Sequence, residues 1–306
     1  MKQYFMMAAI VLLAATSCTN ESELTVVDNN AEQATAPVTV RVNDFSITTE
    51  EMPSGGGTTR AAADPATYFA KGSITLAFYD AEGTEVYKTT QIEDDGTYTT
   101  FGQFTANLQV GTYTMVAVGY PYTEGDEFTL TSPTEAAFTS ERPRETFCKT
   151  QSVTVTSTTP LDLTVTLNRI VSALSIESTD TRPAGIAKIR TTYAKGGKSF
   201  NPTTGLALTD AGFAQTNTPS AAVGSTIKVA SFPFLTSADD EEETMNITIE
   251  VLDADDNVLF THTVANVPFK RNRKTTLRGA IFTASASSAG FQLETSWLTA
   301  ADPINF

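Results

Sequence analysis

The sequence predicts an all-β protein built from two β-sandwiches. Three observations lead to this prediction: Thr is abundant, Val, Ile, Phe and Tyr recur at alternate positions, and stretches with helical periodicity are nearly absent. Alternation with a period of two is the pattern of a half-buried strand, and β-branched and aromatic residues favour strands. The chain has 306 residues. That length is sufficient for two sandwiches of about seven strands each.

The first expected strand covers residues 38–48 and changes phase part-way along. The valines of residues 38–42 share one face, but the apolar pattern then continues on the other parity at Phe45 and Ile47. A slip of one residue turns every later side chain to the opposite face of a strand. We therefore expect a β-bulge at residues 43–44.

The rest of the first sandwich is expected to alternate between strands and polar connections. Residues 52–65 contain three consecutive glycines flanked by prolines and should form a mobile loop. Residues 122–149 are polar and irregular and should form a long loop or a short helix. The further strands are expected at residues 73–79, 84–91, 101–108, 111–120, 152–157 and 161–167. The first two of these form a hairpin, and the fourth is apolar on both faces and should be central.

The second sandwich is expected to begin at a boundary near residues 168–169. Residues 245–252 and 258–264 alternate clearly and should pair as a hairpin around the acidic turn between them. The complete set of strands expected here is residues 170–177, 186–193, 226–234, 245–252, 258–264, 275–282 and 291–297.

The first residues have the pattern of a lipoprotein leader. Lys2 precedes an apolar run over residues 4–15, and small residues lead directly to Cys18. The run is too short to cross a bilayer, which takes about 20 residues, so it reads as a signal peptide. We expect residues 1–17 to be removed and Cys18 to carry lipid that anchors the chain in the outer membrane, with residues 18–36 as an acidic tether. The alternative is an ordinary secretory leader with an incidental cysteine.

Composition excludes several classes of partner and site. The net charge of −15 argues against a nucleic-acid partner and against a basic membrane-docking face. Once Cys18 is lipidated, Cys148 is the remaining cysteine, so no disulfide framework is expected. Packing and backbone pairing must then stabilise the core.

The sequence does not favour an enzyme, a cofactor or a metal site. The one histidine, His262, lies in an alternating strand, so neither a Ser-His-Asp set nor a common zinc site is expected. Asp253, Asp255 and Asn257 have the opening spacing of a calcium loop, but the glycine and the closing glutamate are missing, which favours a hairpin turn. The acidic run 239–243 is interpreted as a solvated loop, with weak divalent-cation binding as the alternative.

Several short motifs, taken in order, resemble the fimbrillins of Bacteroidales, the structural subunits of surface fimbriae. After the lipoprotein leader and first strand come four such motifs: Thr59-Arg60-Ala61, the hairpin at residues 74–83, the junction at residues 168–173 and the basic run at residues 269–274. Thr275 or Thr276 stands where the family often has an aromatic residue. Each motif is short, and the resemblance depends on their order and spacing over most of the chain.

This resemblance implies two transthyretin-like β-sandwich domains, at residues 37–168 and 169–306. It also implies that an Arg-specific surface protease removes the first strand, and that a strand from another copy, or from a related fimbrial subunit, fills the groove. We expect the cut between Arg60 and Ala61, because a Gly-rich loop can enter a protease cleft. Arg41 is the rival site but lies inside a strand. The alternative is that Arg60 is an uncut loop arginine.

The family resemblance places the donor strand in the C-terminal segment. The side chains expected to fill the groove are Phe291, Leu293, Trp297, Leu298, Ile304 and Phe306. The alternative is that this segment is the last strand of its own sandwich. The expected function is a structural subunit of cell-surface fimbriae that serves adhesion. Two alternatives stay open: a fimbrial anchor or accessory subunit that keeps its lipid, and a monomeric glycan-binding surface lipoprotein, which would need exposed Trp and Tyr platforms.

Overall fold

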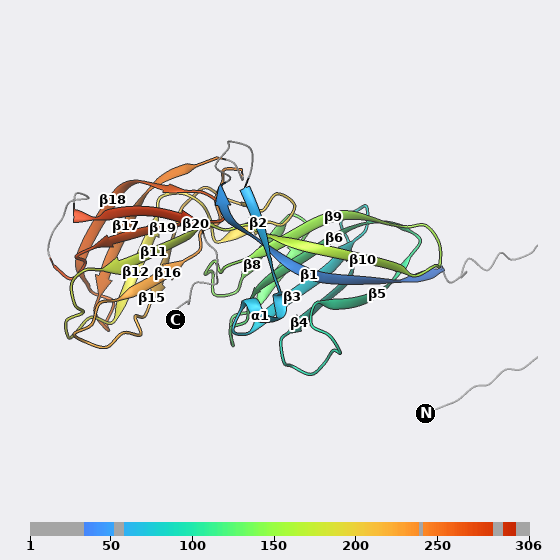
Figure 1. Cartoon of the computed structure of the whole chain (residues 1–306), viewed down its shortest axis with the longest axis horizontal. Coiled ribbons are helices and arrows are strands. Elements are labelled where there is room, and N and C mark those ends of the chain that lie inside the picture. Colours follow the sequence, from blue (N-terminus) through green and yellow to red (C-terminus); the bar gives the residue numbers. More distant parts are fainter. Residues whose placement is uncertain (1–33, 52–57, 239–240, 284–289, 298–306) are drawn as a thin grey trace, which may run out of the picture. The chain divides into compact units, whose positions relative to one another are not determined.

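The computed structural model describes residues 34–51, 58–238, 241–283 and 290–297, and strands dominate them (Figure 1). The predicted all-β sandwich class is confirmed. In chain order, the elements of the first half are β1 (Thr35–Glu51), β2 (Thr58–Ala63), α1 (Pro65–Tyr68), β3 (Gly72–Tyr79), β4 (Glu85–Ile92), β5 (Gln103–Gln109), β6 (Gly111–Pro121), β7 (Phe128–Ser132), β8 (Glu135–Phe138), β9 (Phe147–Val155) and β10 (Leu161–Arg169). Those of the second half are β11 (Ala173–Ser178), β12 (Lys188–Tyr193), β13 (Ser199–Asn201), β14 (Leu206–Ala207), β15 (Phe213–Asn217), β16 (Lys228–Ser231), β17 (Glu243–Leu252), β18 (Val258–Phe269), β19 (Arg273–Gly279) and β20 (Gln292–Trp297).

The first half forms one sheet that folds over its own core. Its strand order is β2-β1-β10-β9-β6-β3-β4, with β5 also paired to β1. The contact between β10 and β9 consists of two residue pairs, Asn168 with Cys148 and Arg169 with Phe147. Apolar side chains of β1, β5 and β10 meet those of β3, β6 and β9 in a single buried cluster. The two parts of the sheet therefore pack face to face as a sandwich.

The second half is a sandwich of two separate sheets. Their strand orders are β16-β11-β19-β20 and β15-β12-β17-β18. Alternate residues of β12 and β17 are buried, and they share one apolar cluster with residues of β11, β16 and β19. This alternation is the pattern from which the strands were predicted.

A fourth sheet joins strands that precede and follow residue 168. Its order is β14-β13-β8-β7, and Phe200 of β13 lies opposite Ala136 of β8. A third buried cluster surrounds it, in which Tyr120 and Phe138 meet Phe232 and Phe234. The described residues from 34 onward accordingly form one compact unit. The domain limits at residues 168 and 169 stay a prediction.

Two of the expected loops are wrong. Within residues 52–65, Thr58–Ala63 form strand β2 and Pro65–Tyr68 form α1. Within residues 122–149 the chain forms β7, β8 and the start of β9, without a helix among these described residues. Both errors have the same physical cause: these strands are short and rich in small or polar residues, so tertiary pairing rather than local propensity decides their structure.

Candidate functional site

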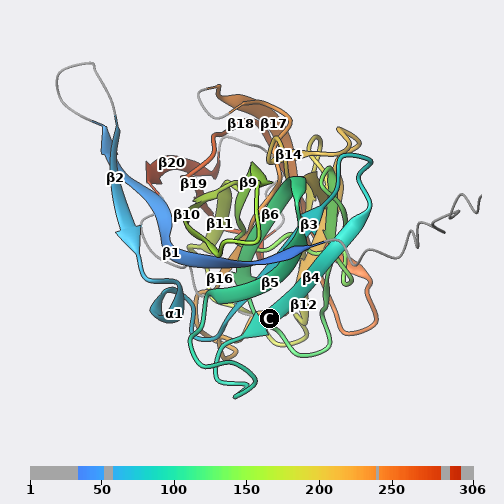
Figure 2. The same cartoon turned by 90° about the vertical axis from the view of Figure 1, so that its right-hand side faces the viewer.

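The first strand, β1, lies inside the sheet with a partner on each side. Residues 38–46 pair in parallel with β10. On the other side, residues 35–41 pair with β5 and residues 45–51 pair with β2. Figure 2 shows β1 running across this sandwich beside β5 and β10. Removal of β1 would therefore leave the backbone groups of both β10 and β5 without their partners.

The inner face of β1 is apolar and changes phase at the predicted position. The valines at its start are at most 5% exposed, and Phe45 and Ile47 continue the buried row on the other parity. The register with β10 shifts between Val42 and Asp44, which confirms the predicted bulge. The exposed Asn43 is the extra residue. The bulge thus lets one strand bury two runs of apolar residues of opposite phase.

Phe45 is the most closely fitted side chain of β1. Its ring stacks on Phe147 with centroids 4.3 Å apart and meets Phe69 and Tyr68 at 5.8 Å. Opposite it lies Gly119 of β6, where a Cβ atom would stand 2.6 Å from the Phe45 ring. Only a residue without a side chain leaves room for the ring at this point.

The predicted protease site lies in a strand rather than in a loop. Arg60 is paired with Thr48, and Ala61 with Ile47, in the antiparallel ladder of β2 and β1. β2 is the outermost strand of its sheet, and the far ends of β1 and β2 stand away from the other strands (Figure 2). Arg41, the rival site, lies inside β1 as expected. A protease would have to open β2 before it could bind Arg60 as an extended chain.

The helix α1 fastens the chain immediately after β2. Asp64 caps it by accepting a hydrogen bond from the amide of Ala66 at 2.9 Å, and Pro65 occupies its first turn. Tyr68, at its end, donates its hydroxyl hydrogen to Glu145 Oε1 at 2.6 Å. The chain that follows the predicted cut is thus bonded to Glu145, outside β1, in addition to its ring contacts with Phe45 of β1.

Glu145 and Arg169 form a buried ion pair beside Tyr68. Arg169 Nε lies 2.9 Å from Glu145 Oε1, and both side chains are at most 2% exposed. The guanidinium also hydrogen-bonds the Tyr68 hydroxyl and lies 5.0 Å from the centre of the Phe147 ring. Burial, together with the Glu145 charge, raises the pKa of Tyr68 well above its ordinary value, so its phenol stays neutral and donates.

The two family motifs at residues 168–173 and 269–274 meet at this ion pair. Arg169 Nη1 donates to Asn272 Oδ1 at 3.2 Å, and the amide of Asn272 donates to the carbonyl of Val171 at 3.1 Å. Ser172 Oγ donates to the carbonyl of Arg273 at 2.9 Å. The motifs therefore form one polar junction between β10 and β19, a role that sequence reasoning did not identify.

The described part of the predicted donor segment forms an edge strand of its own sheet. β20 pairs with β19, with Trp297 opposite Arg273 and Leu293 opposite Leu277. Phe291, just before β20, packs against the second core and meets the His262 ring edge-on at 5.7 Å. Leu293 is 45% exposed, so its side chain is not in the core. Leu298, Ile304, Phe306 and Cys18 lie outside the described residues.

The remaining polar residues of interest have structural roles. His262 is buried, with Nε2 3.0 Å from the carbonyl oxygen of Ile281. Asp253 accepts hydrogen bonds from the amides of residues 255 and 257, both at 2.9 Å, in the predicted hairpin turn. The acidic run departs from expectation at Glu243. This residue is buried and accepts hydrogen bonds from residues 236 and 237, because it starts β17.

Neither a metal site nor a membrane-spanning helix is found in the described part of the chain. No group of three or more His, Cys, Asp and Glu side chains there is arranged to hold a metal ion. Across the same residues, no helix has both the length and the apolar character to span a bilayer.

Comparison with known proteins gives a family but no function. A family model described as "Family of unknown function (DUF6562)" matches residues 34–296. The chain belongs to this family. No protein of curated function matches this DUF6562 member.

Similar solved structures come from species of Bacteroides and Porphyromonas. One is a candidate polysaccharide-binding protein (DUF1812) of Bacteroides thetaiotaomicron, with 11% identity, TM-score 0.49 and coverage of 80% of this chain and 92% of that one. Another is the fimbrial anchor protein Mfa2 of Porphyromonas gingivalis, with 10% identity, TM-score 0.47 and coverage of 88% and 100%. A third is a candidate adhesin of Bacteroides ovatus, with 12% identity, TM-score 0.45 and coverage of 82% and 88%. Similarity at this distance says nothing of what the DUF6562 chain binds.

Proposed function

We propose that this protein is a structural, non-enzymatic subunit of cell-surface fimbriae that serves adhesion. In this proposal it is exported as an outer-membrane lipoprotein through Cys18, cut by an Arg-specific protease between Arg60 and Ala61, and polymerised by strand exchange with copies of itself or related subunits. The observation that carries the proposal is the position of β1. This strand buries an apolar face, has partners on both sides, and pairs at its far end with β2, the strand that contains Arg60. The resemblance of the motifs to fimbrillins supports it.

Loss of β1 would leave an apolar groove between β10 and β5, and binding of another strand in that groove would be strongly favourable. Five large apolar side chains of β1 are buried, from Val38 to Ile47, and their burial contributes roughly 8–15 kcal/mol in total. Each restored ladder hydrogen bond adds about 0.5–1.5 kcal/mol net. An extended strand from a neighbour can recover both contributions, which is the recognition mode of strand addition.

The chain after the proposed cut has polar contacts with the sandwich that would remain when β1 leaves. α1 follows the proposed cut by a few residues, and its Tyr68 is bonded to Glu145 and Arg169. These polar contacts do not involve β1, although the Tyr68 ring also meets Phe45 of β1. A cut subunit can therefore keep its chain end in place while the groove stays open for a donor.

The attachment of β20 supports the C-terminal segment as the donor. β20 is held by its ladder with β19, and four successive residues, Gln292 to Thr295, are exposed. Just before these exposed residues, Phe291 packs against the core. An edge strand with four successive exposed residues opens at low free-energy cost, which favours its exchange.

The position of Arg60 favours a second candidate, a lipid-retaining anchor or accessory subunit. The backbone of Arg60 in β2 is paired with Thr48 of β1. The bond after Arg60 is therefore less available to a protease than a bond in an unpaired loop. If β2 stays closed, β1 and the lipid on Cys18 are both retained. The two candidates thus differ in a single measurable property, the susceptibility of the bond after Arg60.

The test treats residues 19–306 with a trace of Arg-specific protease and follows the products by gel electrophoresis and electron microscopy. The subunit proposal expects a cut after Arg60 followed by SDS-resistant ladders and filaments. Arg60→Gln should abolish both, whereas Arg41→Gln should change neither. Resistance at Arg60 would favour the anchor, and a cut without multimers would refute strand exchange.

A disulfide lock separates cutting from strand release. Thr39 and Thr105 lie opposite each other on β1 and β5. Opposed residues of an antiparallel pair have Cβ atoms about 4.5–5.5 Å apart, close to the spacing that a disulfide needs. The variant Thr39→Cys/Thr105→Cys should be cut normally when oxidised but form no ladders until a reductant is added. Ladders formed under oxidising conditions would show that β1 need not leave.

A further inference from the structure

The residues that directly follow β19 are firmly fixed to the second sandwich. The carboxylate of Asp180 accepts hydrogen bonds from the amide of Ile281 at 2.9 Å and from the amide of Phe282 at 2.8 Å. The carbonyl oxygen of Ile281 also lies 3.0 Å from Nε2 of the buried His262. Both apolar side chains are buried in the core. The end of β19 is therefore a fixed point of this sandwich.

Phe291, directly before β20, packs against this fixed region. A Cβ atom on Gly279, the last residue of β19, would stand 2.8 Å from Cδ1 of the Phe291 ring and 3.0 Å from the carbonyl oxygen of Gly290. The missing side chain of Gly279 thus leaves the space that the ring occupies. The half-buried ring also meets His262 edge-on at 5.7 Å and contacts the apolar cluster of the second sandwich.

Beyond Phe291, β20 is held mainly by its backbone. It is the outermost strand of its sheet and pairs with β19, and residues 292–295 are all exposed. Residues opposite each other in a ladder point to the same face, so Leu293 lies on the face on which Leu277 is fully buried. Leu293 is nevertheless 45% exposed. The core that covers Leu277 does not extend over Leu293.

The two parts of this segment differ in what their release would cost. Opening β20 breaks ladder hydrogen bonds, but water can replace those bonds at an exposed edge. Withdrawing Phe291 would instead expose an aromatic ring and leave an empty space against Gly279. The opening of lowest cost therefore begins at Gln292 and leaves Phe291 in place.

The spacing of apolar residues in β20 matches that of the groove under β1. Val38 and Val42 are four residues apart on the buried face of β1, and both are at most 5% exposed. Leu293 and Trp297 are likewise four residues apart in β20, with Thr295 between them. Residues at this spacing share one face of a strand. A donor that begins at Gln292 can thus present two large apolar side chains to the same face of the groove.

We propose that Phe291, packed on Gly279, stays in its own subunit as the hinge from which residues 292 onward swing into the groove that β1 leaves in a second copy of this chain. The inference rests on the proposed function and defines where the donor segment begins. Leu293 enters the groove and Phe291 does not, so these two apolar residues have opposite roles.

The first test examines uncut residues 19–306 by hydrogen-exchange mass spectrometry and thermal unfolding. The amides of residues 292–297 should exchange about tenfold faster, or more, than those of residues 277–282. Phe291→Ala should lower the unfolding midpoint by about 2 °C or more, whereas the matched control Leu293→Ala should lower it by less than about 1 °C. Equal exchange in the two segments, or equal shifts from the two substitutions, would overturn the hinge.

The second test measures donor binding to protein that is cut after Arg60 but cannot exchange its own β20. Thr276 and Glu294 lie opposite each other on β19 and β20, so an oxidised Thr276→Cys/Glu294→Cys pair should hold β20 in place. Fluorescently labelled synthetic peptides of residues 290–306 and 292–306 are then titrated. The two should bind equally within about twofold, because the groove takes no contact from Phe291. Leu293→Ala in the shorter peptide should weaken binding about tenfold or more, and Phe291→Ala in the longer peptide should leave it unchanged.

The negative results distinguish this inference from the function on which it rests. If the longer peptide binds about tenfold more tightly than the shorter one and loses that advantage on Phe291→Ala, then Phe291 enters the groove. That result, or unchanged binding on Leu293→Ala, would overturn the hinge while leaving strand exchange intact. Resistance of Arg60 to the protease, seen on the gel, or binding of neither peptide would refute the proposed function, and this inference would fall with it.

Discussion

The fit between Phe45 and Gly119 offers a direct probe of how β1 is held. Gly119→Ala would place a methyl carbon 2.6 Å from Cζ and 2.7 Å from Cε1 of the Phe45 ring, and 3.3 Å from Leu167 Cδ1. Contacts below 3 Å force a neighbour to move, and the stacked ring has Phe147 directly behind it at 4.3 Å. The substitution should therefore displace Phe45, and β1 with it.

The expected size of the effect follows from two opposing contributions. Overpacking a core typically costs about 1–3 kcal/mol, whereas Gly→Ala gains about 0.4–1 kcal/mol by restricting the unfolded chain. The net loss for Gly119→Ala is then about 1–2 kcal/mol. Phe45→Ala alone should cost about 3–5 kcal/mol. In the double variant the new methyl group enters the space left by the ring, so the two losses should not add.

The assay is a double-mutant cycle on uncut residues 19–306, with the free energy of unfolding measured in urea by circular dichroism. We expect the loss of unfolding free energy in the double variant to be smaller than the sum of the two single losses by about 1–3 kcal/mol. Gly72→Ala, whose Cβ would come no closer than 3.5 Å to any atom, is the control and should not couple to Phe45. Additive losses at Gly119 and Phe45 would refute the packing argument.

Three further predictions concern buried polar groups. Glu145→Ala removes the carboxylate that faces the buried charge of Arg169 and should cost about 3–5 kcal/mol in urea unfolding. Asp162→Ala breaks an exposed ion pair with Arg41 and should cost less than about 1 kcal/mol. A larger loss for Asp162→Ala than for Glu145→Ala would contradict this ranking. Burial raises the pKa of Tyr120 to about 12. The folded state therefore holds this proton more tightly than the unfolded state, so stability should be complete below about pH 10 and fall as the pH rises toward 12. Tyr120→Phe should flatten that fall, and an unchanged pH profile would argue against the assignment. Burial also raises the pKa of Cys148 to about 12, so iodoacetamide should label it only after unfolding, and rapid labelling of the native protein would show that the thiol is accessible.

Where side-chain alternation is strong, the sequence was a reliable guide. The slip of apolar parity between Val42 and Phe45 has one simple structural explanation, and the bulge lies at that position. The hairpin of β3 and β4 and the turn at Asp253 were also predictable, since a turn and its two alternating flanks are local signals.

Pairing partners that are distant in sequence leave no such signal. β2 was expected to be a loop because it follows three glycines, but its pairing with β1 makes it a strand. The ion pair of Arg169 with Glu145 was not predicted, and neither was its contact with Tyr68, because the partners come from separate elements. The motif around Arg169 was noticed as a family feature, but its physical role depends on contacts that only the fold creates.

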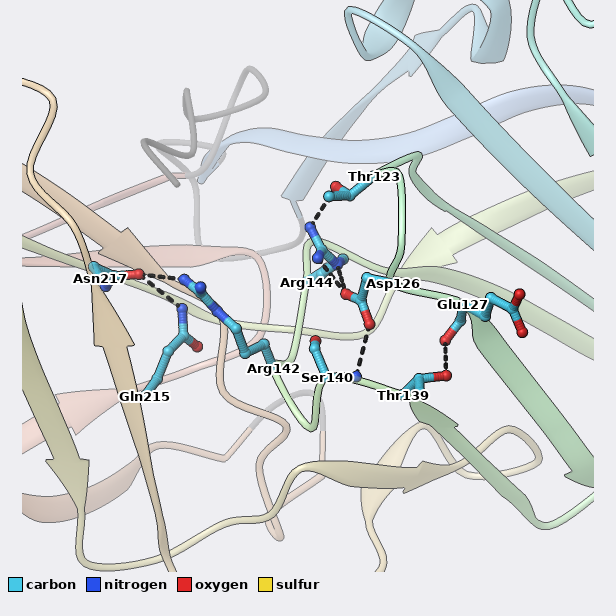
Figure 3. Close-up of polar contacts among 9 residues, drawn as sticks. All are labelled: Thr123, Asp126, Glu127, Thr139, Ser140, Arg142, Arg144, Gln215 and Asn217. Carbon is cyan, nitrogen blue, oxygen red and sulfur yellow. Dashed lines mark hydrogen bonds and ion pairs between the residues drawn. The ribbon is translucent and has the colours of Figure 1, made fainter.

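The burial of Ser73 shows the same limitation in another form. Ser73 alternates with Ile74 and Leu76 on β3, so the sequence pattern indicates an outward-facing polar residue. It is nevertheless 1% exposed, and it lies near the segment containing Thr123 and Asp126, which Arg144 holds by a hydrogen bond and an ion pair (Figure 3). The alternation of apolar and polar residues along β3 cannot predict burial that depends on segments distant in sequence.

The most direct test of the proposed maturation is the identity of the first residue of the protein in its assembled form. SDS-resistant material would be recovered from the cell surface and its N-terminus determined by mass spectrometry. The fimbrial subunit proposal predicts that the chain begins at Ala61, without β1 and without lipid. Assembled protein that begins at lipid-bearing Cys18 would contradict the subunit proposal and support a retained anchor.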